Sequence, residues 1–128
     1  MKRITREWVE KAEGDFATAE RELRARKRPN FDSACFHAQQ CAEKYLKARL
    51  QEADLPFTKT HHLTLLLDQV LKVEPLWEIL SPALRTLTAF AVDFRYPGEG
   101  ADKAMARQEV AFCLEVRKQT RESLRLDR

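Results

Sequence analysis

Glycine is scarce in this chain, with only three among 128 residues. The sequence shows no glycine-rich loop of the kind that cradles phosphates, and no serine nucleophile elbow. It also shows no pair of carboxylates placed for catalysis. Three common signatures of enzymes are therefore missing.

Long apolar runs are missing as well. No stretch approaches the roughly 18 uninterrupted apolar residues of a membrane-spanning helix, and the first residues, MKRITREWVEKAEGD, lack the apolar core of a secretion signal. The three cysteines, Cys35, Cys41 and Cys113, show no close CxxC spacing. We expect a cytoplasmic protein whose thiols act as small hydrophobic groups and form no disulfide.

The composition favours one helical domain. Hydrophobic residues make up 44% and charged residues 34% of the chain, which is a globular balance. Alanine, leucine, glutamate, lysine and arginine are abundant, and all of them favour helix. The net charge of +3 permits an anionic partner without requiring one. We expect a single all-α domain over residues 1–128.

Apolar residues recur every three or four positions and predict four main helices and one shorter helix. The predicted helices cover about residues 5–26, 30–53, 63–73, 81–95 and 101–124. Thr5 and Asn30 are placed to cap the first two, and Ser81 with Pro82 is a good start for the fourth. The simplest packing is an antiparallel up-and-down four-helix bundle with an additional short helix.

The second predicted helix carries a polar stripe. His37, Gln40, Lys44 and Lys47 share one face, and such a stripe is usually solvated. If the helices alternate in direction, the start of this helix and the helix end at Arg95 lie at the same end of the bundle. We therefore expect His37 and Gln40 to border a cleft near Arg95. Lys47 and Gln51, farther along, are expected to be solvated.

Arg95 permits two interpretations. A cation at a helix C-terminus complements the helix dipole, so Arg95 is a candidate cap. It is also followed by Tyr96 and a proline-glycine loop, which places an anion-binding fork beside a stacking ring. The second interpretation makes Arg95 and Tyr96 site residues.

Three separated stretches resemble one family. They are ACFHAQQCAEKYLKARL at 34–50, TKTHHLTLLL at 58–67 and FRYPGEGAD at 94–102. Together with Trp8, Asp15 and Phe16 in WVEKAEGDFATAE, they are similar to the HEPN domain. The resemblance implies a helical bundle that commonly dimerises and acts as a nucleotide- or RNA-associated module. Many similar proteins are partners of a small nucleotidyltransferase, often in toxin-antitoxin pairs.

With this resemblance, the candidate nucleotide- or RNA-binding residues are His37, Gln40, Lys44, Arg95 and Tyr96. Other members of the family are metal-independent ribonucleases, which use an arginine and then a histidine after four to six intervening residues. No tyrosine follows Tyr96, so the adenylylation of a tyrosine known in the family is not carried over to this chain.

The ribonuclease motif is missing here. Counting from Arg95, the histidine would fall at Gly100, Ala101 or Asp102. Metal-free RNA cleavage needs a group that titrates near neutral pH, and arginine does not act as a base. We expect a binding module with no cofactor and no catalytic residue. The alternative is a ribonuclease with a non-standard site that uses Arg95 and His37.

A metal site is not expected. His37, Cys41, His61 and His62 could be imagined as four ligands, but the short paired spacings of structural zinc are absent. His61 is expected to cap or brace the short helix. The family often has an acid at the position of His62, so the role of that acid is not carried over.

For each of two further segments, the sequence permits two interpretations. The basic run RELRARKR at 21–28 closes a helix and is usually solvated, but its cations also suit phosphate contacts. In VEPLWEILSP, Leu76 or Trp77 either contacts a second subunit or is buried within the monomer. We expect a homodimer.

Overall fold

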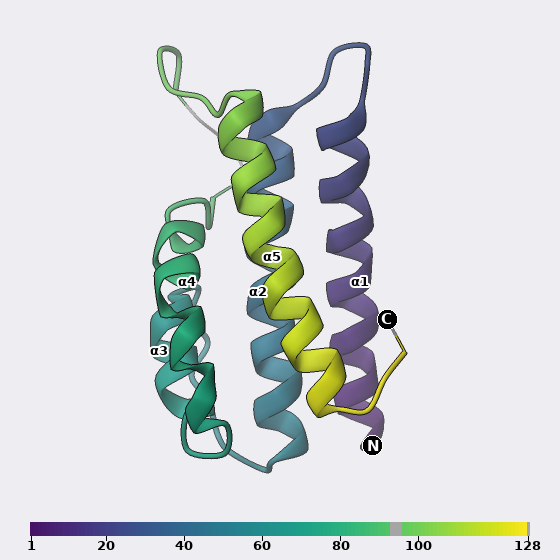
Figure 1. The fold of residues 1–128 in the computed structure, drawn as a ribbon, viewed down its shortest axis with the longest axis vertical. Helices are drawn as coiled ribbons and strands as arrows, with labels where there is room; N and C mark the ends of the chain where they lie inside the picture. The colour runs from purple at the N-terminus through teal and green to yellow at the C-terminus, as the bar shows by residue number, and fades with distance from the viewer. Residues whose placement is uncertain (93–95, 128) are drawn as a thin grey trace.

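The computed structural model describes residues 1–92 and 96–127, and this part of the chain contains helices and no strand. Its elements are α1 (Arg3–Arg24), α2 (Phe31–Glu52), α3 (Leu63–Val70), the 3₁₀ helix η1 (Pro75–Leu80), α4 (Ser81–Thr88) and α5 (Lys103–Ser123). The chain passes up through α1, down through α2, up through α4 and down through α5, with α3 added beside α4 (Figure 1). The predicted all-α bundle with an additional short helix is confirmed.

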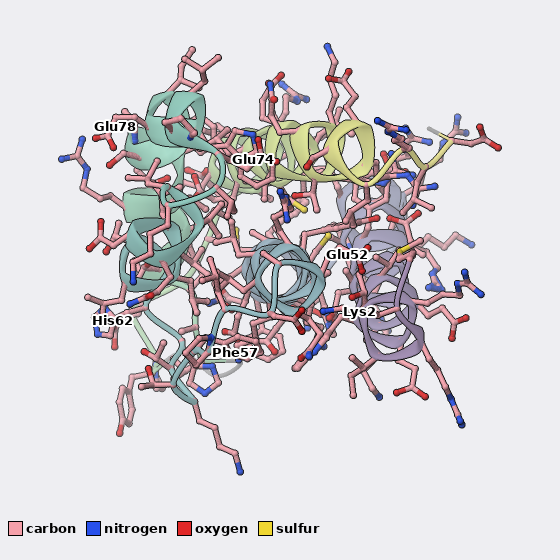
Figure 2. The ribbon with its side chains drawn as sticks, turned by 90° about the horizontal axis from the view of Figure 1, so that it is seen from below. Lys2, Glu52, Phe57, His62, Glu74 and Glu78 are labelled. Carbon is pink, nitrogen blue, oxygen red and sulfur yellow. The ribbon has the colours of Figure 1, made fainter. Side chains whose placement is uncertain are left out.

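Helix α2 is the central element of the bundle. Viewed from below, it is surrounded by α1, α5, the α3 and α4 pair, and the linker that carries Phe57 (Figure 2). None of the residues from Phe31 to Glu52 is fully exposed. A helix packed against this many elements places several of its polar residues in the interior, and those residues then need internal partners.

The hydrophobic core lies where the helices meet α2. Its largest fully buried side chains include Tyr45, Leu46, Leu50, Leu63, Leu66, Leu67, Leu84 and Leu87. Each fully buried side chain of this kind stabilises the fold by about 1.5–3 kcal/mol. All three cysteines are buried free thiols.

The helix ends agree in part with the predictions. Asn30 caps α2, because its side chain accepts a hydrogen bond from the Ser33 amide at 2.9 Å. The predicted cap at Thr5 is wrong, because α1 begins earlier and the Thr5 hydroxyl donates to Glu52 at 2.9 Å instead. This bond joins the start of α1 to the end of α2, where Lys2 also lies beside Glu52 (Figure 2).

The fourth helix is shorter than predicted. It ends at Thr88 and does not continue to Arg95. The Thr88 hydroxyl accepts a hydrogen bond from the Leu63 amide at 3.2 Å and donates to the Leu84 carbonyl at 2.9 Å. The end of α4 is therefore tied to the start of α3. Beyond it, the amides of residues 89–91 bond to carbonyls three residues back, a tight turn geometry that does not extend the α-helix.

Within residues 1–92 and 96–127, no helix combines the length and the apolar character that crossing a bilayer requires.

Glu109 is a buried acid between α4 and α5. Its side chain is bonded to the Thr86 hydroxyl at 3.0 Å, and only 3% of the residue is exposed. Burial raises the pKa of Glu109, and the hydrogen bond from Thr86 lowers it by less. The carboxylate is therefore less stable here than in the unfolded chain.

Replacing Glu109 by glutamine is expected to raise the free energy of unfolding at neutral pH by roughly 0.5–2 kcal/mol. A folded-state pKa above the unfolded value means that stability is complete at low pH and falls as pH rises through the folded pKa. The gain should therefore vanish below about pH 4, where the glutamate is neutral in both states. Urea denaturation at several pH values measures it, with the exposed Glu115→Gln on the same helix as control. A gain that persists unchanged at low pH would contradict this explanation.

Candidate functional site

The polar stripe of α2 is enclosed between α1 and the linker at residues 53–62. Three residues on this side of the helix, Gln39, Glu43 and Lys47, are buried. His37, Gln40 and Lys44 are half-buried. The stripe is therefore an internal polar network with one accessible edge.

The first part of this network is the Asp15 cluster, formed by Asp15, His37 and Lys44. The Nδ1 atom of His37 lies 2.8 Å from one carboxylate oxygen of Asp15, and the Lys44 ammonium pairs with the other oxygen. His37 and Lys44 are seven residues apart on α2, so they lie on the same face of α2, the face that contacts Asp15 on α1. The side chains of Asp15, His37 and Lys44 are 10%, 25% and 22% exposed.

The Asp15 carboxylate fixes the orientation of the imidazole. A neutral histidine facing a carboxylate through Nδ1 carries its proton there, which leaves Nε2 as the acceptor. The Lys44 charge is balanced by Asp15 in the same cluster. The arrangement therefore presents one oriented imidazole edge beside a paired lysine.

The second part is the Glu43 cluster, formed by Gln39, Glu43, Lys47 and His61. One Glu43 oxygen lies 2.9 Å from His61 Nδ1, and the other accepts from the Lys47 ammonium at 2.9 Å. Gln39 donates to Glu43 at 3.2 Å and to the His61 carbonyl at 3.1 Å. These bonds attach the linker to α2 directly before α3 begins.

The charges in the Glu43 cluster balance each other. Burial raises the pKa of Glu43, but hydrogen bonds from Lys47 and His61 outweigh it, and the net pKa lies below its ordinary value. The Lys47 ammonium also lies 5.5 Å from the Trp8 ring and 6.0 Å from the Phe57 ring. These distances suit cation-π attraction.

The expectation that Lys47 is solvated is wrong, and of the two roles expected for His61, capping and bracing α3, the cap is wrong. Lys47 is only 7% exposed and is not solvated, because the linker folds back over it. His61 does not cap α3 with its side chain, because its ring binds Glu43 on α2. Gln51 is half-buried.

Gln40 joins the stripe to the Glu43 cluster. Its amide donates to the Gln39 side-chain oxygen at 2.7 Å, and Gln39 continues to Glu43 and His61. Gln39 is not among the site residues predicted from the sequence, although it is fully buried. Its position seven residues before Leu46, on the core side of α2, is the signal that would have identified it.

The Arg95 half of the expected site is only partly described. Arg95 lies outside the described residues. Tyr96 is 66% exposed and belongs to the loop that precedes α5, at the upper end of the bundle in Figure 1. Among the described residues, His37 and Lys44 meet at Asp15. Gln40 is linked through Gln39 to the Glu43 cluster.

A third network lies on the α5 side of α2. Tyr45 donates to Glu13, and Arg117 makes two bonds to the same carboxylate at 2.8 and 2.9 Å. Arg121 donates to the Tyr45 hydroxyl at 3.2 Å. Burial and the bond to Glu13 raise the pKa of Tyr45. We call Glu13, Tyr45, Arg117 and Arg121 the Tyr45 cluster; it joins α1, α2 and α5.

Among residues 1–92 and 96–127, no group of three or more histidine, cysteine, aspartate or glutamate side chains is placed to hold a metal ion.

A family model for the HEPN domain matches residues 5–124. The chain belongs to the HEPN domain family. No curated protein and no solved structure matches it. At the level of the family, membership supports a nucleotide- or RNA-related module.

In this HEPN chain, the positions that would hold a nuclease histidine after Arg95 serve the start of α5. The Ala101 amide donates to Asp32 at 2.7 Å, and Asp102 caps α5 by accepting from the Met105 amide at 2.8 Å. Gly100 lies against the Asp32 carboxylate as well. These residues anchor the loop to α2 and begin the last helix.

Proposed function

We propose that this HEPN protein is a nucleotide- or RNA-associated binding module and the partner of a small nucleotidyltransferase in a two-component, toxin-antitoxin-like system. The observation that carries the proposal is family membership combined with Gly100, Ala101 and Asp102 at the histidine positions. Without an imidazole there, the loop is suited to hold an anionic group but has little means of moving a proton near neutral pH. The proposed binding residues are Arg95, Tyr96, His37, Gln40 and Lys44.

The geometry of α2 supports a binding role. His37 and Lys44 are held by Asp15, and Gln40 is held by Gln39, so the accessible edge of the stripe is rigid before any ligand arrives. A preorganised edge loses less side-chain entropy on binding.

The test is to co-express the protein with a nucleotidyltransferase encoded beside it. We expect a complex that survives size-exclusion chromatography and leaves added RNA intact. Intact mass after incubation with ATP reports any adenylyl transfer to this chain. Failure of the two proteins to associate would contradict the partner role.

A second candidate function is a metal-independent ribonuclease that uses Arg95 and His37. The observation that favours it is the 2.8 Å contact between Asp15 and His37 Nδ1, since a carboxylate that orients an imidazole is a common arrangement for a general base. This candidate requires purified protein to cut single-stranded RNA in the presence of a chelator. Arg95→Ala and His37→Ala should each abolish cutting. Intact RNA under these conditions removes the candidate.

We also propose that the protein forms a homodimer through η1. Leu76 is 86% exposed and Ile79 is 77% exposed, whereas Trp77 between them is buried at 4%. Leu76 is therefore available to contact a second subunit, whereas Trp77 is buried within the monomer. Beside them lies a hollow of about 640 Å³ with Pro75 and Gln119 on its lining, which offers apolar surface to a second copy.

Replacing both Leu76 and Ile79 by glutamate is expected to convert a dimer to a monomer, because charges buried in an apolar interface are strongly unfavourable. Light scattering coupled to size-exclusion chromatography measures the mass. Ile4→Glu and Leu65→Glu, two exposed positions on α1 and α3, form the matched control. A dimer that persists in the η1 variant would place the interface elsewhere.

A further inference from the structure

The upper end of the bundle contains a cationic hollow of about 620 Å³. It lies between the end of α1, the loop at residues 25–29, the start of α2 and the start of α5. Figure 1 shows this loop and the start of α5 at the same end of the molecule. The side chains that matter are Arg24, Arg26, Lys103 and Arg107 around Leu23 and Phe31. We call this feature the cationic hollow.

The cations of the hollow come from segments far apart in the sequence. Arg24 and Arg26 belong to the basic run at 21–28, and Lys103 and Arg107 belong to the first turns of α5. All four residues are exposed, and none of the described residues on the lining carries a carboxylate. Folding therefore adds two cations to a basic run that the sequence alone would leave as a solvated helix end.

The nearby acids are engaged by other groups. Glu22 accepts from the Asn30 amide at 3.0 Å, and Asp102 accepts from the Met105 amide as the cap of α5. Of the four cations, Arg24 has an ion pair, with Glu20 at 3.3 Å, in a surface geometry that contributes little stability. Gathering like charges costs free energy, and a bound anion offsets that cost.

We propose that the cationic hollow binds the phosphate groups of single-stranded RNA. Three of the four cations are arginines, whose planar forks match phosphate oxygens in a bidentate way. The half-buried Phe31 ring offers an apolar surface on which a base stacks, which an acidic protein segment would not use. This site is separate from the Asp15 cluster and needs no nucleotidyltransferase partner.

The test is fluorescence anisotropy with a labelled oligouridylate of about 20 nucleotides, titrated over a range of salt. The variant is Arg26→Glu with Arg107→Glu. The control is Arg3→Glu with Lys72→Glu, which changes the net charge equally at the opposite end of the bundle. All four positions are exposed, so the fold is expected to survive, and circular dichroism checks this.

The hollow variant is expected to bind RNA at least about tenfold more weakly, and its salt slope should fall by about 0.7 for each phosphate that the protein no longer neutralises. The control should stay within about twofold, because its charges lie outside the site. Equal weakening of both variants would overturn the proposal in favour of a net-charge effect. Absence of RNA binding by the native protein at low salt would overturn it as well. Equal competition by polyglutamate would assign the hollow to an acidic protein partner instead.

This experiment is read separately from the partner test. The substituted residues lie outside the candidate set on α2 and the loop, so association with a nucleotidyltransferase should be unchanged in the hollow variant. If the hollow variant loses RNA binding but still forms the complex, the result supports the cationic hollow as an RNA site separate from the surface that binds the partner. If the native protein binds RNA, the hollow variant does not, and no complex forms, the result supports the cationic hollow and contradicts the proposed partner.

Discussion

Glu43→Ala is expected to lower the free energy of unfolding by about 3–5 kcal/mol, the usual cost of removing one partner of a buried ion pair. The side chains of Glu43 and Lys47 are 5% and 9% exposed. Without the carboxylate, the Lys47 ammonium remains enclosed between Trp8 and Phe57 with no counter-charge. Urea denaturation followed by tryptophan fluorescence and circular dichroism measures the loss.

Two comparisons separate this mechanism from a general packing defect. Replacing both Glu43 and Lys47 by methionine should cost less than Glu43→Ala alone, because no buried charge is left unpaired. The exposed Glu115→Ala should change stability by less than about 0.5 kcal/mol. If the double variant is the least stable of the set, charge pairing is not the cause.

The Glu43 effect should also depend on pH. Its folded-state pKa is lowered, so its stabilisation is present above the unfolded pKa of about 4.3 and is lost as pH falls through the lower folded value. The difference between the native protein and Glu43→Ala should therefore shrink in acid. A constant difference from neutral pH to about pH 2 would contradict the pairing.

Tyr45→Ala is the second large change and is expected to cost about 3–5 kcal/mol, the usual range for removing a buried aromatic ring. Tyr45 is fully buried between α1, α2 and α5. Its hydroxyl also links Glu13 to Arg121. The loss therefore combines an unfilled cavity with a broken polar network.

Tyr45→Phe separates the two contributions. The ring remains and only the hydroxyl is lost, so the expected cost is about 1–3 kcal/mol, the penalty for leaving buried partners short of a hydrogen bond. Glu13 keeps its two bonds to Arg117, which limits the penalty. Equal destabilisation by Tyr45→Ala and Tyr45→Phe would show that the hydroxyl network, and not the ring, accounts for the stability.

The helices were predictable from the sequence because their signals are local. Apolar spacing and the cap at Asn30 are readable within a few residues, and they define α1, α2 and α5 to within a few positions. The end of α4 is different, because it depends on the bond between Thr88 and the Leu63 amide. Nothing near Thr88 in the sequence indicates that contact.

For the α2 part of the candidate site, the sequence predicted which residues share a helix face but did not predict what surrounds them. His37, Gln40 and Lys44 share a face of α2 as expected. Their partners are Asp15, which tertiary packing brings from α1, and Gln39, the residue directly before Gln40. Lys47 has the spacing of a solvated cation and is buried, because a linker with no helical pattern covers it. Helical periodicity describes one element and says nothing about a loop that returns across it.

The linker is attached at two points, where Phe57 packs beside Lys47 and where His61 binds Glu43. Between them, Thr58 and Lys59 are exposed. Thr58 and Lys59 are therefore suitable positions for a fluorescent label or an inserted epitope. Residues added there can extend into solvent while Phe57 and His61 keep their contacts with α2. A deletion at Thr58 and Lys59 would instead pull Phe57 or His61 away from α2 and expose Lys47.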